Sequence, residues 1–261
     1  VVKATRDAAA KLLEYRGFFE EDLEAIWAAR GTDYFLRERP EDITWHTEAI
    51  SDHDHRESPL VLVRQPHDSP IGNATQIFVH ALDEPDLFAR ICAELEMLDL
   101  SINDARIYSG TDGATLDTFF VLQADGNPVP ADDNTLEHIR RTLQKALEHG
   151  HKRAVSRRTS RQLKAFLMPT ETHVHQDMDR NWTVLEVATP DRPGLLARIG
   201  EIFIDFNIAL QAAKIQTLGE RVEDVFFIVD NQGGQVTEEA RLAGLQAAIR
   251  GALDEGVRQS A

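Results

Sequence analysis

Hydrophobic residues recur along the chain at two spacings, and each spacing predicts one kind of element. Residues 184–187 alternate around Glu186 and predict a short strand that ends at Pro190, because proline cannot continue a sheet ladder. Intervals of three and four residues, which are typical of one buried helix face, then separate Leu195, Ile199, Ile202, Phe203 and Phe206. A helix therefore follows a strand in this part of the chain.

The same region continues with two more strands and a second helix. We expect a strand over residues 213–217, a turn over 218–221 and a closing helix over 238–253. The apolar run 225–229 predicts a central strand that is buried on both faces.

This pattern occurs twice, which indicates an internal duplication. Residues 73–109 align without a gap with residues 181–217 at a constant offset of 108, and eleven of the 37 aligned positions are identical. The first copy closes with a predicted helix over 134–147. Its earlier helix repeats the apolar face with Leu87, Ile91, Leu95 and Leu98.

A short strand candidate precedes each copy, at residues 60–64 and 172–176. With it, each copy has a four-stranded antiparallel sheet and two helices on one face, an α+β architecture. Helical periodicity before the first copy predicts helices over 4–15 and 20–30. The chain then divides into a helical connector (1–58), a first domain (59–150), a basic linker (151–170) and a second domain (171–261).

The strongest candidate for a binding site is the strand-to-helix junction Asp191-Arg192-Pro193-Gly194-Leu195-Leu196. Pro193 suits a first helical turn, and Gly194 lets a ligand approach the main chain. Free amides and the positive end of the helix dipole can then hold a carboxylate. Asp191 can hold an ammonium group, and Asn207 can add an amide contact. The same residues also fit a capped helix start with only a packing role.

The repeated unit resembles the ACT domain, a ferredoxin-like module that binds free amino acids in metabolic enzymes, and residues 191–215 carry its signature. The whole chain resembles the C-terminal part of the bacterial enzymes that uridylylate and deuridylylate the PII signalling protein. This resemblance rests on Thr32-Asp33-Tyr34-Phe35, Ile43-Thr44-Trp45-His46, LFARICAEL, DGATLDTFFVLQADGNP, HQDMDRNWTVLEVATPDRPGLLARIG and LGERVEDVFFIVD.

The resemblance implies two tandem ACT domains that sense L-glutamine in nitrogen regulation. It also implies an upstream nucleotidyltransferase domain that transfers UMP from UTP to PII, and an HD-type phosphohydrolase domain that removes it. Neither the Gly-Ser-plus-paired-Asp motif of the first nor the spaced metal ligands of the second occurs in this sequence. We therefore expect the catalytic residues, and the Mg²⁺ that the family implies, to lie outside this chain, with no cofactor or metal within it.

The two copies differ at the candidate site. The second copy has Arg192, Gly194 and Asn207 at the positions where the first has Glu84, Asp86 and Asp99. An incoming carboxylate would meet like charges in the first copy, at a cost on the order of 1 kcal/mol each. We therefore place the ligand at the second copy. A secondary site at the first copy (Asp83, Glu84, Asp86 and Asp99) and a site at the junction of the copies remain open.

The histidines and the single cysteine predict no metal site and no nucleophile. His53-Asp54, His67-Asp68 and the His-x-His pairs lack the three or four converging ligands that a metal needs, so we interpret them as surface residues. Cys92 lies on a predicted apolar helix face, where we expect a core thiol. A lone cysteine forms no disulfide framework and is typical of a cytoplasmic protein.

The net charge of the chain limits the kinds of binding partner that we expect. The 28 Lys and Arg residues against 44 Asp and Glu residues give a net charge of −16, which disfavours nucleic-acid and membrane partners. Basic residues cluster over 140–164, which we interpret as a solvated linker and helix face; a docking strip for an acidic surface is the alternative. Two other classes stay open. One is a freestanding amino-acid-binding regulator, and the other is a nucleotide- or RNA-binding ferredoxin-like protein that uses the basic linker with Arg157, Arg158 and Arg161.

Overall fold

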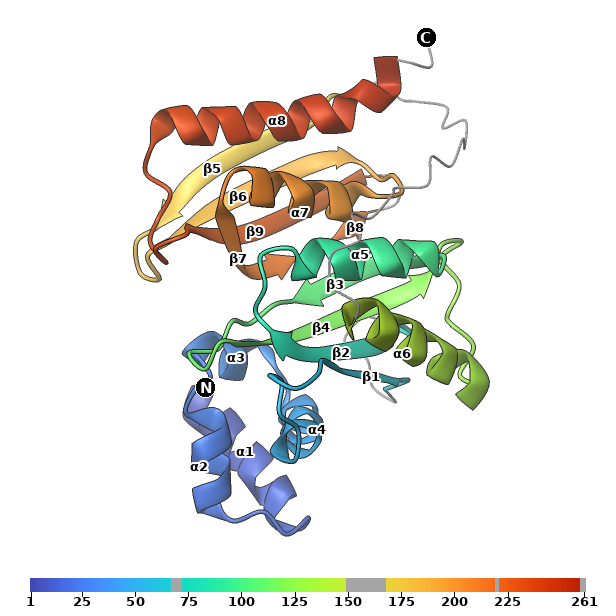
Figure 1. Ribbon diagram of the computed structural model, residues 1–261, viewed down its shortest axis with the longest axis vertical. Coiled ribbons are helices and arrows are strands. Elements are labelled where there is room, and N and C mark those ends of the chain that lie inside the picture. The colour runs from blue at the N-terminus through green and yellow to red at the C-terminus, as the bar shows by residue number, and fades with distance from the viewer. Residues whose placement is uncertain (67–71, 149–167, 219–220, 259–261) are drawn as a thin grey trace.

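A computed structural model describes residues 1–66, 72–148, 168–218 and 221–258 of the chain. Most of the basic linker, together with His67-Asp68 and the His149/His151 pair, lies outside the described residues. The molecule is elongated, with the N-terminal helices at one end, the first repeat in the middle and the second repeat at the other end (Figure 1). Within the described ranges, no helix is long and apolar enough to cross a bilayer.

The N-terminal segment folds into four helices, and the two helices predicted there are confirmed. They are α1 (Val2–Glu14), α2 (Glu20–Trp27), α3 (Thr32–Arg37) and α4 (Pro40–Ser51). Pro40 begins α4, where its missing N–H costs no hydrogen bond. Leu13, Tyr34 and Ile43 of these helices share one buried cluster with Phe78 and Leu116 of the first sheet.

The first repeat has the predicted four strands and two helices. They are β1 (Leu60–Arg64), β2 (Thr75–Leu82), α5 (Leu87–Met97), β3 (Leu100–Arg106), β4 (Ala114–Gln123) and α6 (Asp133–Glu148). All strand pairs are antiparallel, in the order β1-β2-β4-β3, so the strand that precedes the repeat completes the sheet as expected.

The second repeat has the same topology. Its elements are β5 (Glu171–Asp177), β6 (Trp182–Pro190), α7 (Leu195–Asp205), β7 (Ile208–Lys214), β8 (Thr217–Leu218), β9 (Arg221–Asp230) and α8 (Glu239–Arg258). The order β5-β6-β9-β7 confirms the ferredoxin-like fold of both repeats, and the short β8 adds a fifth strand that pairs with β9.

Two details of the second repeat differ from the sequence prediction. The strand expected over 213–217 is β7, which already begins at Ile208, and a register shift between Leu210 and Ala212 hides its alternation. The central strand β9 is not fully buried on both faces, because Val225 and Phe227 are only partly buried. Its counterpart β4 is buried on both faces over Ala114–Val121, since the N-terminal helices cover the outer face of the first sheet.

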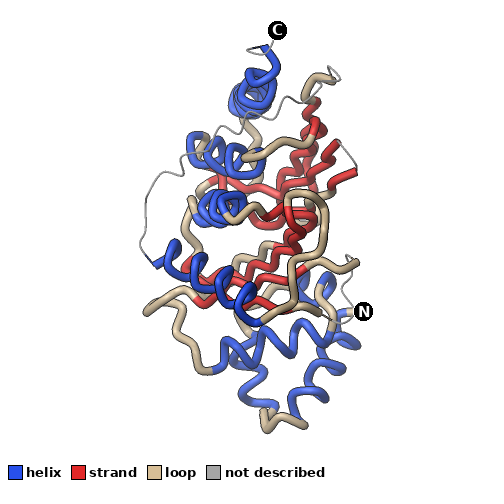
Figure 2. The backbone as a smooth tube through the Cα atoms, turned by 90° about the vertical axis from the view of Figure 1, so that its right-hand side faces the viewer, coloured by secondary structure: helices blue, strands red, loops and turns tan. Residues whose placement is uncertain are grey.

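The two repeats pack side by side through equivalent elements. Helix α5 lies against α7, and the edge strands β3 and β7 are in contact. The helices of both repeats stack along one side of the strands (Figure 2). Gly200 of α7 packs so closely on Ala89 of α5 that a Cβ atom at position 200 would lie 2.8 Å from the Ala89 Cβ. A single core runs through both repeats and includes Cys92, which is buried as expected.

Candidate functional site

The junction between β6 and α7 is a tight turn rather than the start of the helix. The Leu195 N–H donates to the Arg192 carbonyl at 3.4 Å, and α7 begins only at Leu195. Gly194 has φ 78° and ψ 2°, the left-handed values of the third position of a type II turn. The expectation that Pro193 occupies the first helical turn is therefore wrong. Pro193 instead fixes φ at the second position of this turn, a role that proline also favours.

The turn between β6 and α7, residues 191–195, forms the strand-to-helix corner of the second repeat. Asp191 and Arg192 have different surroundings in this corner. Arg192 donates to the carbonyl of Leu253 in α8, and burial lowers the pKa of its guanidinium while the Asp254 carboxylate opposes that shift. Loss of hydration raises the pKa of the Asp191 carboxyl, although the Arg192 N–H partly compensates. Arg192 is thus tied to α8, whereas Asp191 is an exposed residue of the turn.

A carboxyl that the sequence pattern does not single out lies in the same part of the core. Asp224 of β9 is 1% exposed, and its Oδ1 accepts the Gln216 N–H at 3.2 Å. In the part of the chain that the structure describes, its Oδ2 is buried without a hydrogen-bond partner. Burial, with a contribution from the Asp191 charge, raises the pKa of Asp224 to about 7. The signal in the sequence was the alternation of the strand, because Asp224 shares the core-facing side with Phe226 whereas the adjacent Glu223 lies on the other side.

The equivalent corner of the first repeat is closed by its own side chains. Its turn is of type I, with Asp86 at φ −98° and ψ −1°. The Arg90 guanidinium lies 2.8 Å from the Glu84 carboxylate and 3.8 Å from the Asp86 carboxylate. The Arg90 guanidinium therefore already pairs with the acidic side chains at the N-terminus of α5. In the second repeat the equivalent Arg198 is exposed and pairs with Glu201 at 2.8 Å instead.

The structure separates Asn207 from the other predicted site residues. Helix α7 has 11 residues and is therefore about 16 Å long, and Asn207 follows its C-terminus. Asn207 has φ 51° and donates its N–H to the Ile204 carbonyl at 3.0 Å, so it ends the helix. Asp99 has the same left-handed conformation after α5, with φ 55°. Both residues are explained by helix termination, and we leave them out of the site.

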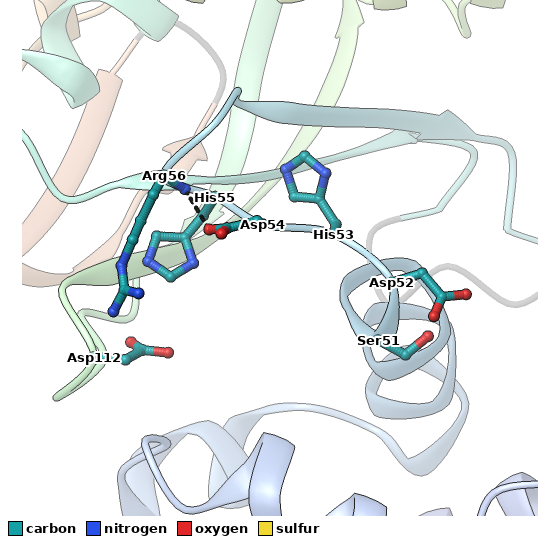
Figure 3. Close-up of a pocket in the computed structure, with 7 residues that line it drawn as sticks. All are labelled: Ser51, Asp52, His53, Asp54, His55, Arg56 and Asp112. Carbon is teal, nitrogen blue, oxygen red and sulfur yellow. Dashed lines mark hydrogen bonds between the residues drawn. The ribbon is translucent and has the colours of Figure 1, made fainter.

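The loop after α4 forms an open cavity of about 580 Å³, shown in Figure 3. The His53 Nε2 lies 2.8 Å from the Ser58 carbonyl, and the ring of His55 lies 5.1 Å from that of His80. Burial lowers the pKa of His80 to about 4, so this imidazole is neutral at pH 7. Among the residues that the structure describes, no group of three His, Cys, Asp or Glu side chains could hold a metal ion.

Comparison with known proteins identifies relatives of nearly the whole chain. Residues 1–49 match the family model described as the fifth domain of the uridylyltransferase GlnD. The chain is 42% identical over 250 residues (95% of this chain and 28% of the relative) to a protein of Stutzerimonas stutzeri named bifunctional uridylyltransferase/uridylyl-removing enzyme. A protein of the same name from Azotobacter vinelandii is 43% identical over 257 residues (98% and 29%).

A third protein of that name, from Pseudomonas aeruginosa, is 42% identical over 250 residues (95% of this chain and 28% of the relative). The chain therefore spans less than a third of the length of these relatives. Among solved structures, a chain titled as an unknown protein from Galdieria sulphuraria aligns with 70% of this chain and 91% of its own length, at 13% identity and a TM-score of 0.23.

Proposed function

We propose that this chain, which is homologous over almost its whole length to the C-terminal region of the bifunctional uridylyltransferase/uridylyl-removing enzymes, is a glutamine-sensing regulatory region. In this proposal the whole protein is a cytoplasmic enzyme that transfers UMP to the PII signalling protein and removes it again. The catalytic residues and their Mg²⁺ belong to domains outside this chain, which regulates them as an allosteric pair of ACT domains.

The observation that carries this proposal is the difference between the two strand-to-helix corners. In the second repeat the Gly194 turn presents main-chain amides at the positive end of α7, with the Asp191 carboxyl beside it. These groups complement the carboxylate and the ammonium of a free amino acid. In the first repeat the Arg90 side chain already pairs with the acids of the corner. Glutamine is therefore assigned to the second repeat.

Calorimetric titration of the chain with glutamine tests this assignment. Gly194→Asp is expected to weaken binding at least tenfold, because it adds a negative charge beside the bound carboxylate. Gly194→Asn is the matched control: asparagine adopts the left-handed conformation about as well and adds no charge, so its effect should be clearly smaller. Asp86→Gly in the first repeat should leave binding unchanged. Absence of any glutamine binding by the unaltered chain would refute the sensing role.

Helix α3 provides a physical path from the second repeat to the N-terminal helices. The Arg180 guanidinium lies 3.0 Å from the Asp33 carboxylate, and Arg37 donates to the Ala213 carbonyl of β7 at 3.0 Å. A cavity of about 470 Å³ lies between α3 and this end of the second repeat. Glutamine can shift the equilibrium between two arrangements only if it binds one of them more tightly. The contacts of Arg180 and Arg37 would carry such a shift from the second repeat to residues 1–49, the region that matches the fifth-domain family.

Hydrogen exchange of α3 tests this path. In the unaltered chain, saturating glutamine is expected to change the exchange rate of the amides of Thr32–Arg37. The double variant Arg37→Ala/Arg180→Ala should bind glutamine normally but lose this response, because both side-chain links to the second repeat are removed. Arg198→Ala, which removes an exposed pair with Glu201 only, should keep the response. An unchanged response in the double variant would exclude α3 as the relay.

A further inference from the structure

The duplication allows the buried aspartates of the two repeats to be compared position by position. Asp117 of β4 and Asp224 of β9 occupy equivalent places in LDTFFVL and EDVFFIV. Each side chain is almost fully buried, and each accepts a main-chain N–H from an equivalent residue, Tyr108 in the first repeat and Gln216 in the second. A buried acid at the same point of both sheets is therefore a shared feature of the fold.

The second hydrogen bond of each aspartate distinguishes the repeats. In the first repeat the Thr115 hydroxyl donates to Asp117. The residue equivalent to Thr115 is Val222, which has no side-chain donor, and no residue within the described ranges donates to the Asp224 Oδ2. Leaving a buried polar atom unpaired costs about 1–3 kcal/mol. A ligand that supplies the missing donor would explain an unmet acceptor of this kind.

Asp224 lies on the core-facing side of β9, next to the strand that carries the Asp191 turn. Asp224 pairs with Val187 on β6, the strand that leads directly into the Asp191 corner. Its side chain is on the same face of β9 as Val222 and Phe226, which belong to the core beneath α7. The charge of Asp191 contributes to the raised pKa of Asp224, so the two carboxyls interact electrostatically.

We propose that Asp224 is a ligand-binding residue of the second repeat, whose unpartnered Oδ2 accepts a hydrogen bond from the α-ammonium group of the bound amino acid. This inference rests on the proposed function and deepens it. An ammonium group has three N–H donors, so its contact with Asp224 leaves further donors for other acceptors of the site. Thr115 satisfies Asp117 within the chain, and the first repeat therefore lacks this acceptor for a ligand.

The chemistry predicts that binding releases a proton. The pKa of Asp224 near 7 means that a substantial fraction of the free protein carries a proton on this carboxyl at pH 7. An arriving ammonium favours the carboxylate form, and the displaced proton passes to the solvent. The Asp191 charge favours the protonated form of Asp224 until the cation arrives. The Cys92 thiol of α5 also interacts electrostatically with Asp224, but burial raises the pKa of this thiol, so it is neutral at pH 7. Affinity for glutamine should therefore rise between about pH 6 and pH 8.

Calorimetry of the full-length protein with glutamine tests the inference through an isosteric substitution. Val222→Thr supplies Asp224 with the hydroxyl that Thr115 gives to Asp117, so glutamine affinity should fall at least tenfold. It should also abolish the proton release, measured by titration in buffers of different ionisation enthalpy. Asp224→Asn, which keeps the shape and the Oδ1 acceptor, should weaken binding in the same way. Thr115→Val, the mirror-image control in the first repeat, should leave affinity and proton release unchanged.

The outcomes separate this inference from the function on which it rests. Unchanged glutamine binding by Val222→Thr and Asp224→Asn, with no proton release by the unaltered protein, would overturn the role of Asp224 and leave glutamine sensing intact. If the unaltered protein binds no glutamine, the proposed function and this inference fail together. Thermal unfolding of each variant shows whether it is folded, and Val222→Thr should be at least as stable as the unaltered protein.

Discussion

Replacing Glu38 by alanine is expected to lower the free energy of unfolding by about 3–5 kcal/mol, the range for breaking a buried ion pair. Glu38 follows α3, and its side chain is fully buried. Its carboxylate accepts from the Arg106 guanidinium at 2.8 Å and from the Tyr108 hydroxyl at 3.0 Å. Burial raises the pKa of Glu38, whereas the charge of Arg106 lowers it and so favours the carboxylate form that the ion pair needs. Removal of the carboxylate leaves a buried cation that has lost its closest partner.

Urea-induced unfolding measures this decrease in the free energy of unfolding, and two further variants are compared with Glu38→Ala. Glu38→Gln keeps a hydrogen-bonding oxygen for Tyr108 and Arg106 but removes the charge, so its loss should be smaller than that of Glu38→Ala. Glu201→Ala removes an exposed ion pair with Arg198 and should cost less than about 1 kcal/mol. Similar losses for Glu38→Ala and Glu201→Ala would show that the buried network does not anchor α3 to the first sheet.

This network also shows what a sequence pattern cannot reveal. The duplication, the strand order and the helix faces were predictable, because each depends on local periodicity or on a constant offset of 108 residues. The partners Glu38 and Arg106 lie on different elements, and no local period connects them. A buried charge therefore looks like a surface charge in the sequence until its partner is known.

The candidate corner was predictable in its residues but not in its geometry. A Pro-Gly pair before a helix fits both a first helical turn and a type II turn, and only the φ of 78° at Gly194 decides between them. Asn207 likewise fits a ligand contact or a left-handed helix end, and the structure places it at the end of the helix far from Gly194. Asp224 looks in the sequence like an exposed acid ahead of a pair of aromatic residues, although its alternation places it with the core.

Replacing Gly200 by alanine is expected to destabilise the chain by about 1–3 kcal/mol, because it overpacks the contact between the two repeats. The added Cβ would lie 2.8 Å from the Cβ, 3.1 Å from the Cα and 3.3 Å from the backbone nitrogen of Ala89. Two of these atoms belong to the main chain of α5, so no side-chain rotation relieves the clash. The helices α5 and α7 must separate, and the core that joins the repeats must separate with them.

A glycine in another helix provides the control for backbone effects. A Cβ atom added at Gly251 of α8 would have no heavy atom of another described residue within 4 Å, and alanine there should be neutral or stabilise the chain by about 0.5–1 kcal/mol through helix propensity. The difference between the two variants in urea-induced unfolding therefore isolates the contact at Ala89. Ala89→Gly in the Gly200→Ala background removes the closest of the clashing atoms and should recover part of the loss. Equal stability of Gly200→Ala and Gly251→Ala would mean that the repeats are not held at this close distance, and a signal passing between them would need another contact.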